Sequence, residues 1–202
     1  MTETSLVVQW LSKDFGRLAT VAKGGRRTKS QFRGKIDLFY VASFSFQRSS
    51  RSDLHNLREV SLENSNPQIR EDLRFVEQAS YAARLVETAT ERETPLPEVF
   101  ALMNGFLAYL PGQPPVPTSV FALELKLLSE LGLAPPIESA LLSAGSRQFM
   151  AALVTMPWEL IPRLRPAAAQ GREIGQFLQR FLLYHLGKVP LGRDAAVQMP
   201  EP

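Results

Sequence analysis

A run of basic residues is the clearest chemical feature of this chain. Between Gly16 and Lys35 the sequence carries seven basic side chains and no acidic one. They are Arg17, Lys23, Arg26, Arg27, Lys29, Arg33 and Lys35. Clustered cations repel one another unless a polyanion neutralises them, and a sugar-phosphate backbone is such a polyanion. The segment therefore predicts a nucleic-acid contact, with an ordinary solvated surface loop as the simpler alternative.

Two glycines, Gly24 and Gly25, interrupt this run directly after the alternating segment Arg17–Lys23. The alternation predicts a β-strand that leads into the basic residues. Glycine accepts positive φ and lets the backbone come close to a ligand. We therefore expect both glycines to take positive φ and to belong to the same binding site as the seven basic side chains.

The net charge is unevenly distributed along the chain. Residues 1–60 hold eleven basic and five acidic side chains, which gives +6, whereas the whole chain carries +3. The remainder is therefore mildly acidic. This asymmetry favours one local anion-binding face over a generally basic surface.

Short alternating segments fill the first 62 residues and predict β-strands. The expected strands are Ser5–Ser12, Arg17–Lys23, Asp37–Gln47 and Leu54–Leu62. Short antiparallel strands in so few residues suit a small closed barrel.

The apolar spacing becomes helical after Glu63. Asn66 is expected to cap a first helix that has Pro67 at its first position. Further helices are expected near residues 95–110, 121–132, 139–143, 147–155 and 171–186. The sequence thus predicts an α+β protein with a β-barrel domain over residues 1–63 and an all-helical domain over residues 64–202.

Metal, disulfide and membrane chemistry have little support in the sequence. The chain has no cysteine, and its two histidines, His55 and His185, are far apart and are interpreted as surface or structural residues. No apolar run reaches the roughly 18 residues of a membrane span, and no export-signal pattern opens the sequence. We expect a cytoplasmic protein without metal or cofactor.

An enzymatic function has the weakest support. Glu87, Glu91 and Glu93 lie in one polar segment and are interpreted as a solvated face. The Lys23–Arg26 stretch has the wrong spacing for a phosphate-binding loop of the strand, GxxxxGK[ST], helix kind. No histidine stands near a plausible nucleophile. We therefore expect that the protein is not an enzyme.

Several stretches, taken in order, resemble the RecO family of recombination mediators. The stretches similar to the family's first hairpin and basic loop are Glu3–Val8, Asp14–Leu18 and Val21–Ser30. Those similar to the end of its barrel, its long helix and its C-terminal helix are Leu57–Val60, Phe121–Pro135 and Tyr184–Lys188. Together these stretches span nearly the whole chain.

The resemblance implies an N-terminal OB-fold, a helical C-terminal domain and a non-enzymatic role in DNA repair. It implies binding of single- and double-stranded DNA, annealing of complementary strands, and help for RecR and RecA in displacing the single-strand-binding protein. It also implies RecR and the C-terminal tail of the single-strand-binding protein as partners. The residues predicted above to bind a polyanion match the family's DNA-binding region.

Three departures from the family pattern are visible. Gly25 and Thr28 replace frequent alanine and proline, which predicts a more flexible loop. Residues 136–148 hold no cysteine, so the four-cysteine zinc module of many members does not carry over. Glu3–Val8 resembles the family's second strand. We therefore expect that Met1 is not the natural start, that a first barrel strand is missing, and that an open edge lies beside Leu6–Ser12.

A protein-interaction adaptor is the alternative interpretation. The helical part is larger than the β-rich part, so the small β domain would then merely cap a helical binding surface. Such a protein would bind a protein partner and retain no DNA.

Overall fold

The computed structural model describes residues 3–198, and the chain divides into two compact units. Unit 1 comprises the residues up to Pro67 together with Thr90–Phe100. Unit 2 comprises Gln68–Ala89 and the residues from Ala101 onward. All four strands lie in unit 1, and most of the helical residues lie in unit 2, so the predicted α+β class is confirmed.

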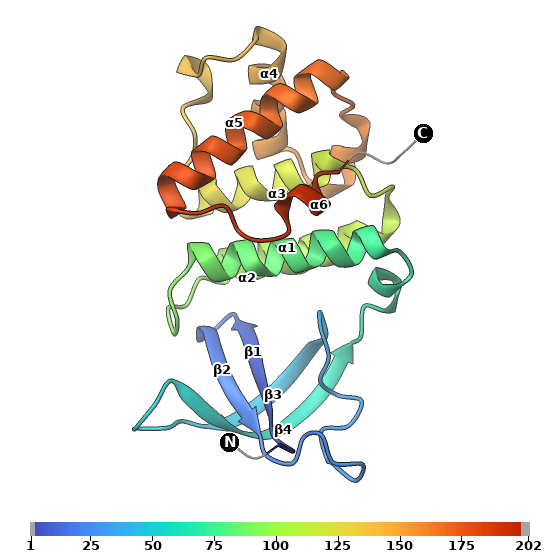
Figure 1. The fold of residues 1–202 in the computed structure, drawn as a ribbon, viewed down its shortest axis with the longest axis vertical. Helices are drawn as coiled ribbons and strands as arrows, with labels where there is room; N and C mark the ends of the chain where they lie inside the picture. The colour runs from blue at the N-terminus through green and yellow to red at the C-terminus, as the bar shows by residue number, and fades with distance from the viewer. Residues whose placement is uncertain (1–2, 199–202) are drawn as a thin grey trace. The chain divides into compact units, whose positions relative to one another are not determined.

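Unit 1 is built on one four-stranded sheet (Figure 1). Its strands are β1 (Leu6–Ser12), β2 (Gly16–Ala22), β3 (Val41–Gln47) and β4 (Leu54–Asn64). Their order across the sheet is β1-β2-β4-β3. β2 and β4 run parallel, whereas the β1–β2 and β3–β4 pairs are antiparallel. The four expected strands therefore all form, in an OB-fold-like unit.

The third strand starts later than the sequence pattern predicts. Residues 37–40 form a turn in which the Tyr40 N–H donates to the Asp37 carbonyl at 3.4 Å, and Phe39 has a φ of 64°. The Asp37 carboxylate accepts from the Leu38 N–H at 2.8 Å, which stabilises the turn locally. The strand predicted from Asp37 thus begins only at Val41. The contact of the Asp37 carboxylate with the backbone favours the turn over β-sheet hydrogen bonds at residues 37–40.

The sheet has two edges within residues 3–198, namely β1 and β3. The expected open edge beside Leu6–Ser12 is confirmed, and backbone pairing does not close the sheet into a barrel. The Trp10 and Phe44 rings, one from each edge strand, stack with centroids 4.2 Å apart. Trp10 is held by a 2.8 Å hydrogen bond from its Nε1 to the Thr20 hydroxyl. Aromatic packing therefore joins the two edge strands.

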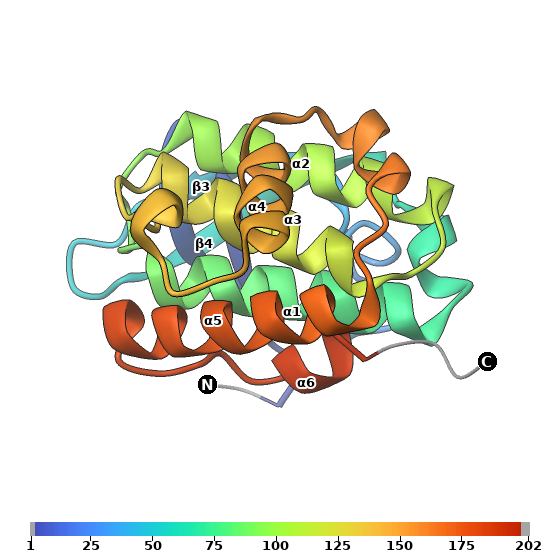
Figure 2. The same ribbon diagram turned by 90° about the horizontal axis from the view of Figure 1, so that it is seen from above.

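Six α-helices are found in the described part of the chain. They are α1 (Leu73–Ala89), α2 (Pro97–Tyr109), α3 (Pro117–Glu130), α4 (Ala144–Thr155), α5 (Ala168–Leu186) and α6 (Arg193–Ala196). The 3₁₀-helices are Pro67–Arg70, Leu110–Gly112, Ile137–Ser139 and Trp158–Arg163. Within unit 2, α3 is almost fully buried, with α1 on one side and α4 and α5 on the other (Figure 1). The short α6 packs beside α1 (Figure 2).

Two helix predictions need correction. Asn66 does not cap a helix, because its φ is 45° and its side-chain Nδ2 donates to the Phe39 carbonyl at 2.7 Å. Pro67 opens only a 3₁₀ turn, and α1 begins six residues later. There the Asp72 carboxylate accepts from the Arg74 N–H at 2.9 Å, and that contact lowers the pKa of Asp72. The helix expected near residues 139–143 is replaced by the 3₁₀ turn Ile137–Ser139.

A buried ion pair fixes α6 in unit 2. Arg193 Nε donates to Glu124 Oε1 at 2.7 Å, and Nη2 donates to Oε2 at 3.0 Å, with the two side chains 3% and 0% exposed. The Tyr81 hydroxyl donates to the same carboxylate at 2.5 Å. Burial, with the Glu124 charge beside it, raises the pKa of Tyr81 far above its ordinary value. The Glu124 carboxylate on α3 thus accepts hydrogen bonds from two other helices, α1 and α6.

Candidate nucleic-acid interface

The basic loop, residues 23–35, follows β2 and leads towards β3. It is a series of tight turns. In each turn a backbone N–H donates to the carbonyl three residues earlier at 3.0–3.2 Å. The donors are Gly25, Arg27, Ser30, Arg33 and Lys35. The loop is therefore hydrogen-bonded along most of its length.

Three contacts anchor the basic loop on the sheet. Phe32 is 5% exposed and packs in the core of unit 1 with Leu57 and Val60. The Gln31 amide donates to the Arg58 carbonyl at 3.0 Å. The Arg26 N–H donates to the Thr4 carbonyl at 3.0 Å. Gly25 and Thr28 predicted a more flexible loop. These three contacts fix the path of its backbone on the sheet.

Six of the seven predicted cations lie on the exposed side of this loop. They are Lys23, Arg26, Arg27, Lys29, Arg33 and Lys35. Arg33 Nη1 donates to the Thr28 carbonyl at 3.1 Å, and within residues 3–198 none of the six pairs with a carboxylate. The structure therefore groups six unneutralised positive charges on one ordered segment.

Arg17 stands apart from these six side chains. It is half-buried near the start of β2, and its guanidinium donates to Thr90, from Nε to Oγ1 at 2.9 Å and from Nη2 to the carbonyl at 2.5 Å. The Glu93 N–H donates to the Arg17 carbonyl at 2.8 Å. Lys23 follows six residues later, about 20 Å along an extended strand. Arg17 therefore holds the returning segment 90–100 on β2.

The adjacent glycines Gly24 and Gly25 serve different purposes in the loop. Gly24 has a φ of 68°, as expected. Gly25 does not take positive φ, and that expectation was wrong. Its hydrogen atom instead faces a tight contact, since a Cβ there would lie 3.1 Å from the Ala22 carbonyl and 3.3 Å from the Leu6 Cβ. The glycine pair thus lets the loop turn and pack closely on the sheet.

A polar cleft of about 550 Å³ continues the loop surface onto β3 and β4. Lys35 and Gln31 line it from the loop, and Glu59 lines it from β4. The hydroxyl-bearing residues along it are Ser43, Ser45 and Ser61. The Ser43 and Ser45 hydroxyls donate to the Glu63 and Glu59 carboxylates. The Lys35 ammonium is therefore the group of this cleft that suits a phosphate.

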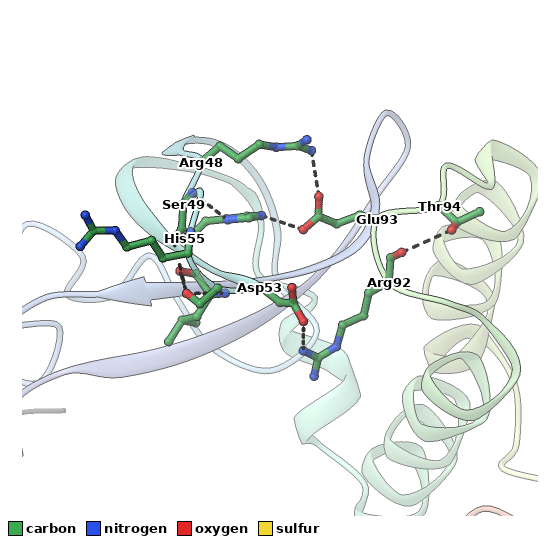
Figure 3. Close-up of polar contacts among 10 residues, drawn as sticks. Arg48, Ser49, Asp53, His55, Arg92, Glu93 and Thr94 are labelled. Atoms are coloured by element: carbon green, nitrogen blue, oxygen red, sulfur yellow. Dashed lines mark hydrogen bonds and ion pairs between the residues drawn. The ribbon is translucent and has the colours of Figure 1, made fainter.

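At the other end of the sheet, Glu93 links two loops (Figure 3). Its carboxylate pairs with Arg48 Nη2 at 2.9 Å and lies 3.0 Å from His55 Nε2. The Ser49 N–H donates to His55 Nδ1 at 3.2 Å, so the imidazole proton sits on Nε2 and points to Glu93. The interpretation of Glu93 as a solvated residue was wrong, whereas His55, 2% exposed, is structural as expected.

A second pair strengthens the same link (Figure 3). Arg92 Nη1 lies 3.9 Å from the Asp53 carboxylate, and the Thr94 hydroxyl donates to the Arg92 carbonyl at 3.3 Å. The β3–β4 loop, residues 48–53, is therefore tied to segment 92–94. The sequence gives no local signal for this link, because its partners lie about forty positions apart along the chain.

A row of aromatic rings on unit 1 is a further feature, and it was not predicted from the sequence. Phe44 and Phe46 lie 5.9 Å apart along β3, and Phe46 stacks on His55 at 5.2 Å. Phe15, in the β1–β2 turn, meets Phe46 edge to face at 5.4 Å and is 41% exposed. A large aromatic residue inside a four-residue polar turn is the sequence signal that would have identified it.

Unit 2 carries a separate groove of about 790 Å³. Its walls are α5 and the connection between α3 and α4. Phe177 and Phe181 stack along α5 at 5.9 Å, next to the exposed Arg180. Leu141 is fully exposed on the facing wall. The groove therefore combines apolar walls with charged groups that include Arg180 and Glu173.

Two kinds of feature are absent from the described residues. Within residues 3–198, no three His, Asp or Glu side chains gather as a metal site would require. None of the helices in that range combines the length and the apolar character needed to cross a bilayer.

The chain thus combines an OB-fold-like unit that has an exposed cationic loop with an α-helical unit. In this combination it is similar to a class of DNA repair proteins. The chain belongs to the RecO family. Residues 1–66 match the family model "Recombination protein O N terminal", and residues 70–141 match "Recombination protein O C terminal".

Individual relatives agree with this assignment. The DNA repair protein RecO of Myxococcus xanthus is 31% identical over 144 residues, which cover 71% of this chain and 59% of the relative. That of Anaeromyxobacter sp. strain K is 29% identical over 220 aligned positions, 92% of this chain and 87% of the relative. That of Bacillus pumilus is 28% identical over 136 residues, 67% of this chain. The match spans 59% and 52% of the lengths of the Myxococcus and Bacillus relatives.

Proposed function

We propose that this protein is a DNA-binding recombination mediator. In this role it binds single- and double-stranded DNA, anneals complementary strands and, with RecR, helps RecA to load on DNA coated by the single-strand-binding protein. The observation that carries the proposal is the basic loop, with six exposed cations and no carboxylate partner within residues 3–198. Membership of a DNA repair family supports it.

The chemistry of the loop favours phosphates over base edges. Its exposed cations are carried by a backbone that Phe32 anchors and that Gly24 bends. Contacts of this kind position a strand without reading its sequence. Lys35 also lines the adjoining cleft beside β3 and β4. We therefore propose sequence-tolerant binding whose affinity depends strongly on salt.

Fluorescence anisotropy on a labelled single-stranded oligonucleotide across a salt series tests the proposal. If the loop neutralises about four phosphates, log affinity falls with log salt at a slope near −3, from roughly −0.7 for each phosphate. A mixed-sequence and a homopolymer strand should give similar slopes. Absence of binding at low salt would refute the proposed function.

We further propose that the groove of unit 2 receives the acidic C-terminal tail of the single-strand-binding protein. The apolar walls suit an aromatic anchor, and Arg180 suits a carboxylate. Titration calorimetry with the tail peptide should give measurable heat, and Arg180→Ala should reduce the affinity. No heat at tens of micromolar peptide would contradict this part of the proposal.

A non-enzymatic role in the cytoplasm, without metal or cofactor, completes the proposal. The second candidate is a helical adaptor, favoured by the same groove because it needs no DNA. The two differ in one measurement. A mediator binds DNA with a steep salt dependence, whereas an adaptor binds only the peptide and leaves DNA unretained.

A further inference from the structure

We propose that Phe15 stacks on an unpaired base of a DNA strand whose phosphates are held by the basic loop. This inference rests on the proposed function and extends it to a second contact, at the opposite end of the sheet. The observations that carry it are the exposure of the Phe15 ring, its rigid support and its distance from the loop.

The Phe15 side chain is partly exposed to solvent. It is 41% exposed, although it contacts Phe46 with centroids 5.4 Å apart and ring planes at 82°. A perpendicular contact covers at most one broad face of a ring, so at least one face of Phe15 is not covered by Phe46. Bases of any sequence stack on such a face, because every base has a π-surface.

Phe15 is supported by the Phe46 ring and by a hydrogen bond in its own turn. Phe46 stacks on His55 at 5.2 Å, and His55 is fixed by the Ser49 N–H and by Glu93 (Figure 3). The Ser12 hydroxyl accepts from the Phe15 N–H at 3.4 Å and stabilises the turn. A preorganised aromatic ring loses little entropy when a base stacks on it.

The surroundings of Phe15 favour a nucleic acid over an apolar protein partner. Lys13 and Asp14, the residues before it, are both exposed and charged. Across the same end of the sheet, the β3–β4 loop carries Arg48 and Arg51, and the Arg51 guanidinium has no hydrogen-bond or ion-pair partner within residues 3–198. Phe15 is the most exposed ring of the aromatic row on unit 1, and one exposed ring among charges is too small a patch for a protein interface.

Spacing sets the length of strand that reaches both contacts. The seven residues of β2 separate the Phe15 turn from the basic loop, a span of about 23 Å at about 3.3 Å for each residue. At about 3.4 Å for each stacked nucleotide, the strand must be roughly seven nucleotides long. Shorter strands can touch the basic loop alone.

The test compares the full chain with Phe15→Ala by fluorescence anisotropy on thymidine 4-mers, thymidine 12-mers and an abasic 12-mer. We expect Phe15→Ala to weaken binding of the thymidine 12-mer by about five-fold or more. Affinity for the abasic 12-mer and for the 4-mer should stay unchanged, and so should the salt slope. Phe15→Tyr should restore binding of the 12-mer.

Val7→Thr is the matched control, because Val7 lies on the same hairpin with 40% exposure and no π-face. It should bind the thymidine 12-mer like the unmodified protein. Circular dichroism and melting temperature check that Phe15→Ala folds.

The outcomes separate the two proposals. If the unmodified protein binds no DNA, the proposed function fails. If it binds with the expected salt slope but Phe15→Ala matches it on the 12-mer, or weakens the abasic strand equally, the stacking inference is wrong and the function stands.

Discussion

The Arg17 guanidinium donates two hydrogen bonds to a single residue, Thr90, one to its hydroxyl at 2.9 Å and one to its carbonyl at 2.5 Å. These bonds fasten the segment that follows α1 to the second strand of the sheet. Arg17 was predicted from its charge to contact phosphates, but its guanidinium forms these hydrogen bonds within unit 1. That Arg17 also contacts DNA stays a prediction.

Arg17→Ala should therefore lower stability more than it changes DNA binding. Loss of charged hydrogen bonds that leave a partner unsatisfied costs about 1–3 kcal/mol. Chemical denaturation measures this cost. Arg17→Lys keeps the charge but not the two-donor geometry, so it should be destabilised similarly. Two results together would contradict this role: an Arg17→Lys variant as stable as the unmodified protein, and an Arg17→Ala variant that loses only DNA affinity. Arg17 would then contact phosphate instead.

Removing Arg26 and Arg27 together should act on DNA binding and not on folding. Both side chains are exposed and unpaired with carboxylates in the described chain. Replacing both by alanine should flatten the salt slope for single strands by about one or more, at roughly 0.7 for each lost phosphate contact. The control, Arg163→Ala with Arg165→Ala, removes two exposed arginines of unit 2 and the same net charge. An equal change in the control would show that only overall charge matters.

Gly16→Ala should be far more damaging than Gly34→Ala. Both glycines have positive φ, 66° and 73°, so each alanine suffers backbone strain of about 1–2 kcal/mol. At Gly34 a Cβ meets nothing within 4 Å, but at Gly16 it would lie 2.0 Å from the Thr94 carbonyl oxygen. Displacing that backbone should cost about a further 1–3 kcal/mol. Equal unfolding free energies for the two variants would contradict the close approach of segment 92–94 to β2.

Arg193→Met should destabilise the protein by about 3–5 kcal/mol, because Glu124 would be left buried without its partner. Adding Glu124→Gln should recover part of the loss, since the amide carries no charge. Urea denaturation of the two single variants and the double variant gives the coupling energy. If the losses simply add, the two side chains do not stabilise each other.

Glu173 should make stability fall at acid pH. Hydrogen bonds from the Ser146 hydroxyl and from the Ser143 N–H and hydroxyl lower its pKa below the ordinary value of 4.5. A carboxylate with a lowered pKa stabilises the fold above the ordinary value, and that contribution is lost as pH falls through the lowered one. The melting temperature of Glu173→Gln should thus lie below that of the unmodified protein at pH 7, with the gap closing as the pH falls below 4.5. A gap independent of pH would contradict this role.

Local patterns in the sequence predicted the strands, most helices and the basic loop. Alternation in Leu6–Ser12 and the helical spacing of Phe121–Leu128 are properties of neighbouring residues, so each segment carries its own signal. The charge of residues 23–35 is likewise local. Exposure of its six cations follows from their type, because a charged side chain without a partner is rarely buried.

Tertiary structure alone decided which polar residues pair and which aromatic rings remain open. Glu93 meets His55 across 38 positions, and Arg17 meets Thr90 across 73. No short-range pattern reports such contacts, since they depend on how segment 90–100 packs on the sheet. For the same reason Phe15 could be recognised as an open ring only after Phe46 and His55 had been placed beside it.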